Sequence, residues 1–188
     1  MKVKINQMLF VILTNILLVV NVGCAQNENT KSPPTTVSKV DLQKYAGLWY
    51  EIAKIPNSFQ DHCAYGTTAE YKIRPDGEIS VINRCYDEEG NLDVAEGVAQ
   101  VVNKKTNSKL EVSFVSFLGW RPFWGDYWII GLDDNYQWAI VGHPEREYGW
   151  ILSRTPKLSD EKMEEIFALL TKQGYDINKF EMTNQDSN

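Results

Sequence analysis

The sequence predicts an all-β fold, an eight-stranded antiparallel up-and-down barrel with one C-terminal α-helix packed outside it. Eight short runs of alternating apolar and polar residues follow one another between residues 48 and 154. Turn residues separate the runs and no helical pattern intervenes, which is typical of an antiparallel meander. One amphipathic segment follows the last run. Eight strands in hairpin order close into a barrel, because closure leaves no strand edge exposed.

Polar turns separate the predicted strands. Pro75-Asp76-Gly77 is one such turn, because Pro presets φ and Gly adopts the left-handed conformation. Segments 87–91, 104–108 and 133–135 are others. The eight predicted strands are 48–55, 65–73, 79–86, 96–103, 110–117, 126–132, 136–142 and 148–154.

The segment 159–173 is predicted to be the helix. Ser159 is a good N-cap, and Asp160 and Glu161 suit the helix dipole in the first turn. Gly174 follows as the C-terminal cap. Apolar residues with helical spacing form one stripe: Met163, Ile166, Phe167 and Leu170. One apolar face indicates a helix that packs against the outside of the barrel.

The first 23 residues have the pattern of an export signal. Basic residues are followed by a mostly apolar run over 8–20, which is shorter than the roughly 20 residues of a membrane-spanning helix. Gly23-Cys24 then resembles the cleavage box of bacterial lipoproteins, in which the Cys becomes the lipidated N-terminus. The alternative is an ordinary signal peptide cut near Ala25, which removes Cys24. Lipidation of Cys24 predicts attachment to a membrane.

The remaining chain divides into a tether, one domain and a tail. Residues 24–39 are polar and are expected to form a flexible tether. The barrel domain with its helix is expected over 40–182, including a short strand within 176–182. The polar tail 183–188 is expected to be frayed.

Charge and cysteine content narrow the function. The formal net charge of −6 argues against nucleic-acid binding, which selects basic surfaces. Cys63 and Cys85 are expected to form a disulfide, since an exported chain meets an oxidising compartment. Two free buried thiols or a metal pair are the alternatives, and His62 is the only nearby His. A tight hairpin at 75–77 places Cys63 about four residues from the position opposite Cys85, so the bridge requires a bulge before the second strand.

Three motifs occur in order along these strands. Gly47-Leu48-Trp49 opens the first, Gly125-Asp126-Tyr127 begins the sixth, and Arg154 ends the eighth. On these motifs the chain resembles the lipocalin family, and residues 40–180 are similar to its bacterial outer-membrane lipoprotein members. The resemblance implies a barrel that binds small hydrophobic ligands. It marks Gly47, Trp49, Asp126, Tyr127 and Arg154 as structural signature residues.

Trp49 and Arg154 are expected to close one end of the barrel. A flat indole can cover that end, and a guanidinium can stack on the ring while its N–H groups bind carbonyls. Taken alone, Trp49 is equally well explained as an ordinary core aromatic.

Ligand contacts are expected from one face of each strand, because side chains alternate between the two faces. We expect the more apolar faces with smaller side chains to line the lumen. The candidates are Tyr71, Ile79, Val81, Asn83, Gly97, Ala99, Val101, Val112, Phe114, Tyr127, Ile129, Trp138 and Ile140. The alternative is that these side chains fill the barrel and leave no cavity.

The segment 117–124 carries four aromatic residues in a loop that Gly119 and Pro122 interrupt. Exposed aromatic clusters mark a binding surface or a membrane contact. The alternative is that the segment folds back over the barrel.

No catalytic, metal or cofactor site is predicted. Cys63 and His62 are adjacent, and neighbouring side chains on an extended chain point in opposite directions. We therefore expect a non-enzymatic lipoprotein of the bacterial cell envelope that carries or stores fatty acids or lysophospholipids at the outer membrane. The alternative is an interaction or structural lipoprotein with a filled barrel. The sequence does not predict an oligomeric state.

Overall fold

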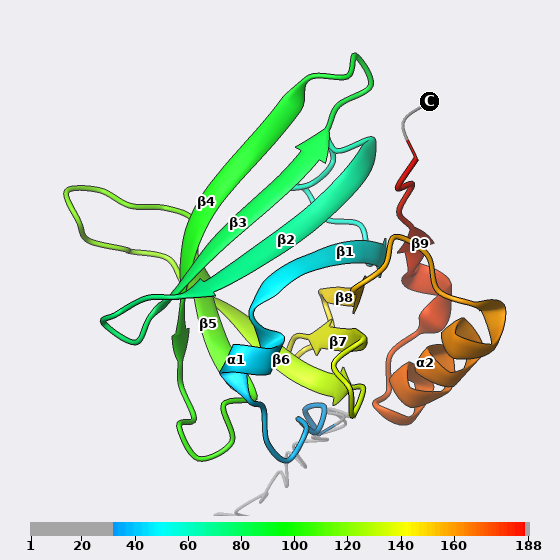
Figure 1. Cartoon of the computed structure of the whole chain (residues 1–188). Helices are drawn as coiled ribbons and strands as arrows, with labels where there is room; N and C mark the ends of the chain where they lie inside the picture. The colour runs from blue at the N-terminus through cyan, green and yellow to red at the C-terminus, as the bar shows by residue number, and fades with distance from the viewer. Residues whose placement is uncertain (1–31, 187–188) are drawn as a thin grey trace, which may run out of the picture. The chain divides into compact units, whose positions relative to one another are not determined.

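The computed structural model describes residues 32–186 (Figure 1). The predicted export signal over 1–23 and the lipidation residue Cys24 lie outside this range. No helix among the described residues reaches the length and apolar character that crossing a membrane requires.

Eight strands form one closed antiparallel barrel, which confirms the predicted fold. The sheet order is β2-β3-β4-β5-β6-β7-β8-β1-β9, and an additional β1–β2 pairing closes it. The strands are β1 Gly47–Lys54, β2 Tyr65–Ile73, β3 Ile79–Tyr86, β4 Leu92–Val101, β5 Lys109–Ser113, β6 Gly125–Leu132, β7 Trp138–Gly142, β8 Gly149–Ser153 and the short β9 Glu181–Met182. Helices α1 Leu42–Tyr45 and α2 Asp160–Lys172 and the 3-10 turn η1 Ile177–Lys179 complete the fold.

β4 begins four residues earlier than predicted and β5 ends earlier. β4 pairs with the whole of β3, from Tyr86 opposite Leu92 to Ile79 opposite Ala99. The early part of β4 was missed because its pattern is inverted there. Leu92 and Val94 are exposed on the outer face, while Asp93 and Ala95 line the interior.

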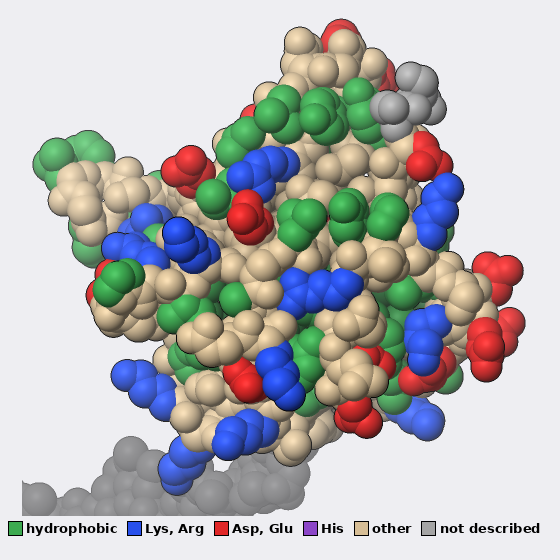
Figure 2. All heavy atoms as spheres, viewed as in Figure 1, with side chains coloured by type: hydrophobic (Ala, Val, Ile, Leu, Met, Phe, Trp, Pro, Cys, Tyr) green, Lys and Arg blue, Asp and Glu red, His purple; other side chains and the backbone are tan. Residues whose placement is uncertain are grey.

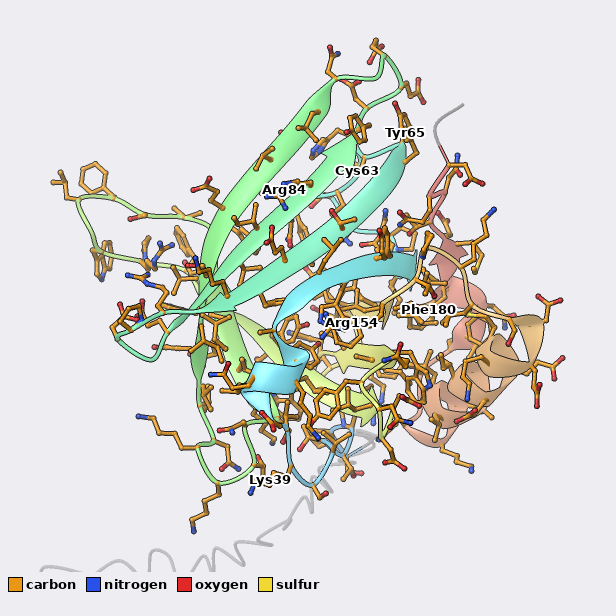
Figure 3. The ribbon with its side chains drawn as sticks, viewed as in Figure 1. Lys39, Cys63, Tyr65, Arg84, Arg154 and Phe180 are labelled. Carbon is orange, nitrogen blue, oxygen red and sulfur yellow. A yellow bond between two sulfur atoms is a disulfide. The ribbon has the colours of Figure 1, made fainter. Side chains whose placement is uncertain are left out.

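One end of the barrel is closed by a plug. Helix α1 was not predicted, and Asp41 caps it by accepting from the backbone N–H of Gln43. Trp49 is fully buried and its indole N–H donates to the Tyr45 carbonyl at 2.8 Å. The guanidinium of Arg154, which is labelled in Figure 3, lies 3.8 Å over the Trp49 ring.

Arg154 also ties several segments of the closed end together. Its guanidinium donates to the carbonyls of Leu48 at 2.6 Å and Ala46 at 3.0 Å. It makes further bonds to the carbonyls of Lys44, Tyr45 and Tyr136. The Arg154 side chain therefore holds together α1, the start of β1 and the turn that precedes β7.

Helix α2 covers the outer face of β7. Met163, Ile166 and Leu170 pack against Trp138 and Ile140. The assignment of Trp138 and Ile140 to the lumen was therefore wrong. All five residues of β7 are buried, so an apolar face could not be read as interior from the sequence. Ala139 and Val141 face the barrel interior instead.

Both ends of the described chain pack on the barrel. The described part of the predicted 24–39 tether is not a free linker, because Pro34 is buried and the Val37 N–H donates to the Ile129 carbonyl at 2.9 Å. The tail expected to be frayed from residue 183 is also held. The Thr183 N–H donates to the Ile52 carbonyl, and the Gln185 side chain donates to the carbonyls of Glu51 and Thr67.

The Cys63–Cys85 disulfide is confirmed, with the two Cα atoms 5.5 Å apart. The pairing of β2 with β3 shifts by one residue between Tyr65 and Thr68, which is the irregularity that the bridge requires. Gly66 adopts φ +66° at this point, a conformation that favours glycine. The bridge therefore fastens the 55–64 loop to the end of β3 (Figure 3).

Candidate functional site

The barrel contains a cavity of about 540 Å³ that opens at the end opposite the plug. This volume is in the range of small-molecule binding sites, which is roughly 300–1,000 Å³. The mouth lies among the connections 55–64, 87–91, 114–124 and 143–148. The barrel is therefore not filled by its own side chains.

A cluster of three tyrosine hydroxyls lies at the floor of the cavity, which Tyr71 and Tyr127 line. The Tyr127 hydroxyl lies 2.7 Å from that of Tyr45 and 2.9 Å from that of Tyr71. Burial raises the pKa of Tyr71 to about 12 and raises the pKa values of Tyr45 and Tyr127 well above 10. The three hydroxyls make two hydrogen bonds with one another, so one O–H group remains that can donate to a ligand. A space of only about 20 Å³ lies beneath this floor.

A polar wall stands on the β1–β3 side of the cavity. The buried Glu51 carboxylate accepts from Lys54 at 3.3 Å, from Gln60 at 2.9 Å and from the Thr183 hydroxyl at 2.7 Å. Thr67 Oγ1 and Asn83 Oδ1 are buried and have no hydrogen-bond partner among residues 32–186. Unpartnered buried polar atoms are costly, so these two are available to a ligand.

Aromatic side chains line the mouth on the β8 side. The Phe59 ring is 5.6 Å from Tyr148, and Tyr148 stacks 6.1 Å from Trp150. The Trp150 indole N–H donates to the Gln60 side chain at 3.0 Å. This arrangement fixes the 55–64 loop over the rim, together with the disulfide.

The predicted lumen residues divide into groups by depth. Those at the large cavity are Tyr71, Val81, Asn83, Val112, Phe114 and Tyr127. Ile79 and Ala99 line the small space below the floor. Val101 and Ile129 belong to the packed core at the closed end.

Gly97 faces the lumen but leaves no free volume for a ligand. A Cβ at this position would lie 2.7 Å from the Phe114 ring. The Phe114 ring therefore occupies the space beside this glycine. The signature residues Asp126 and Tyr127 also line the cavity, so Tyr127 is both a motif residue and a wall residue.

Several cavity residues were missed by sequence reasoning. Thr67 and Ala69 continue the lumen face of β2 from Tyr71 and could have been found by alternation. Val141 lies on the face of β7 opposite the one that was predicted to line the lumen. Phe59 and Gln60 carry no sequence signal, because a loop position depends on how the chain folds back over the rim.

The described residues offer no catalytic arrangement. His62, Cys63 and Cys85 place ligand atoms within 4.8 Å of one another, but both sulfurs are in the disulfide. Cysteine binds a metal as the thiolate, so the oxidised pair leaves His62 as the single ligand of this cluster and the cluster does not form a metal site. The geometry supports binding of an elongated, largely apolar molecule with a small number of hydrogen-bonding groups.

Comparisons with known proteins agree with this geometry. Residues 40–185 match the model of the lipocalin-like domain. The chain is 40% identical to the outer membrane lipoprotein Blc of Escherichia coli over 81% of this chain and 85% of that protein. It is 39% identical to outer membrane lipoprotein Blc of Vibrio cholerae over 91% and 94% of the two chains. The structure of insecticyanin from Manduca sexta is similar with a TM-score of 0.67 and 26% identity, over 84% of this chain and 86% of that one.

Proposed function

Because the chain belongs to the lipocalin family, in which it is a non-enzymatic binding protein for small hydrophobic molecules, we propose that it carries or stores fatty acids or lysophospholipids at the bacterial outer membrane. The single observation that supports this proposal best is the open cavity of about 540 Å³. Its lining is apolar over most of its depth, which suits an acyl chain. The same cavity argues against the alternative of a non-carrier lipoprotein with a filled barrel.

The polar groups of the cavity support a ligand with one polar end. The unpartnered Thr67 and Asn83 atoms lie on the upper wall, above the tyrosine floor. An acyl chain that enters first leaves its polar end near this wall and the mouth. Fatty acids and lysophospholipids share this shape.

The anchor supports the proposed location. The relatives named Blc are outer membrane lipoproteins by name, and Gly23-Cys24 has the pattern of a lipoprotein cleavage box. Lipidation at Cys24 would hold the barrel at the membrane from which its ligands come. One lipidated residue carrying several acyl chains is a stable anchor, since each buried CH₂ contributes about 0.8 kcal/mol.

Titration of the delipidated protein tests the proposal. Palmitate or a lysophosphatidylethanolamine is added while tryptophan fluorescence is followed, because Trp150 and Trp124 line the cavity. We expect saturable quenching with one site. Ala69→Trp fills the lumen and should abolish it, whereas Val102→Trp, at an exposed position near the closed end, should not. Non-saturable signals, or equal titrations in the two variants, would contradict binding in the lumen.

A further inference from the structure

The cavity does not explain the tip of the loop 114–124 between β5 and β6, whose residues 117–120 do not line it. Phe117, Leu118 and Trp120 at its tip are 67%, 93% and 67% exposed, and Phe123 is 69% exposed. In Figure 2 the loop is the projection at the left, and its tip carries hydrophobic side chains. A contiguous group of large exposed apolar residues indicates a contact site.

The tip is built by backbone hydrogen bonds and not by apolar packing. The N–H of Phe117 donates to the Trp120 carbonyl at 2.8 Å, and the reverse bond is 2.9 Å. Leu118 has φ +50° and Gly119 has φ +81°, as in the two-residue turns of β-hairpins. This conformation favours Asn or Gly at the first position, so Leu118 is there against the preference of the backbone.

We propose that this loop inserts into the interface between headgroups and acyl chains of a lipid bilayer and holds the barrel mouth against it. Trp, Phe and Leu are the side chains that partition into this interface. The loop also contains Arg121 and no acidic residue. The Arg121 side chain donates to the Ser113 carbonyl at 3.1 Å, which fixes the base of the loop to β5.

Charge orients the barrel on the surface. The turn 87–91 also lies at the open end and contains Asp87, Glu88 and Glu89. An anionic bilayer repels this turn and attracts a loop whose only charge is positive. Of these two open-end connections, only 114–124 suits an anionic surface, and Figure 1 shows them pointing in different directions.

The loop and the ligand cavity are continuous. Phe123 and Trp124 belong to the loop and also line the cavity, and the Trp124 indole N–H donates to the Arg121 carbonyl at 3.0 Å. Insertion of the tip therefore brings the cavity rim to the lipid surface. A lipid can then enter the barrel without crossing bulk water.

Vesicle flotation tests the proposal with the anchor removed. The probe is a vesicle of phosphatidylethanolamine and phosphatidylglycerol, mixed with lipid-free protein that starts at residue 25 and contains the whole described barrel. We expect the unmodified loop to float with vesicles. Leu118→Asn and Trp120→Ser should each lower the partition coefficient by about tenfold, as expected for one large apolar side chain. Val102→Ser, which removes an exposed apolar residue near the closed end, should leave it unchanged.

The Leu118→Asn variant separates this proposal from misfolding. Asn suits the left-handed conformation, so its melting temperature should equal or exceed that of the parent. Lumen binding of palmitate should be unchanged in both loop variants, so failure here is distinguishable from failure of the proposed function. The proposal is overturned if the parent does not float, if the loop variants float equally well, or if they convert a stable dimer to a monomer, which would make the loop an interface between copies of the chain.

Discussion

Arg154→Ala should destabilise the barrel strongly while leaving ligand affinity nearly unchanged. The change removes a guanidinium that stacks 3.8 Å from the Trp49 ring, which is worth roughly 0.5–2 kcal/mol. It also removes bonds to five carbonyls of the closed end. Water can reach part of this site, so we count about 1 kcal/mol for each of roughly two lost bonds. The expected loss is about 3 kcal/mol.

Thermal unfolding followed by circular dichroism measures this loss. At roughly 2–4 °C per kcal/mol for a domain of this size, the melting temperature should fall by about 6–12 °C. Arg154→Lys keeps a charge over Trp49 but loses the planar fork of donors, so it should recover less than half of the loss. Arg74→Ala is the matched control, because the Arg74 side chain pairs with Asp76 and Glu78 at a surface turn. An unchanged melt, or a larger loss of palmitate affinity than of stability, would refute the plug as the role of Arg154.

Three further predictions concern pH, the disulfide and the anchor. Because burial raises the pKa of Tyr71 to about 12 from an ordinary 10, the unfolded chain ionises first. The stabilisation from the neutral tyrosine is therefore complete below about pH 10 and is lost between about pH 10 and 12. Denaturant titrations across this range should show a smaller loss of unfolding free energy in Tyr71→Phe than in the parent protein. Reduction of Cys63–Cys85 should cost about 3 kcal/mol for a 22-residue separation, and chemical unfolding with and without reductant measures it; an equal midpoint would contradict this. Cys24→Ser should move the protein out of the membrane fraction. Continued labelling of this variant by a radioactive fatty acid would show that Cys24 is not the lipidated residue.

The fold was predictable because it depends on short-range patterns that the chain repeats. Alternation and turn residues predicted eight strands, and Ser159 with the Met163–Leu170 stripe predicted α2 within one residue of its bounds. The disulfide was expected from the export signal, and the bulge that its register requires lies between Tyr65 and Thr68. Trp49 and Arg154 were paired on motif resemblance, and the structure places them in contact.

The errors arose where both faces of an element are apolar or where long-range contacts decide. β7 is buried on both faces, one by the lumen and the other by α2, so alternation could not separate Trp138 from Val141. The terminal segments 24–39 and 183–188 were predicted to be flexible because their composition is polar. Their backbones bind barrel groups far away in the sequence, as between Val37 and Ile129, and composition does not encode such pairings.

Part of the cavity lining also could not be predicted from the sequence. Period-two alternation finds wall residues on strands, as for Tyr71 and Val81, but not how deep each one lies. The ring of Phe114 covers Gly97, so residue size alone gave the wrong estimate of free volume there. The polar wall at Glu51 depends on Thr183 from the other end of the chain.

Native mass spectrometry of the protein purified gently from cell envelopes tests the central claim most directly. The claim is that the barrel interior of about 540 Å³ holds one lipid molecule. We predict a protein population that carries the added mass of a single acyl lipid, lost on collisional activation and absent from Ala69→Trp. A bare mass in every preparation, together with no uptake of added palmitate or lysophospholipid, would contradict it.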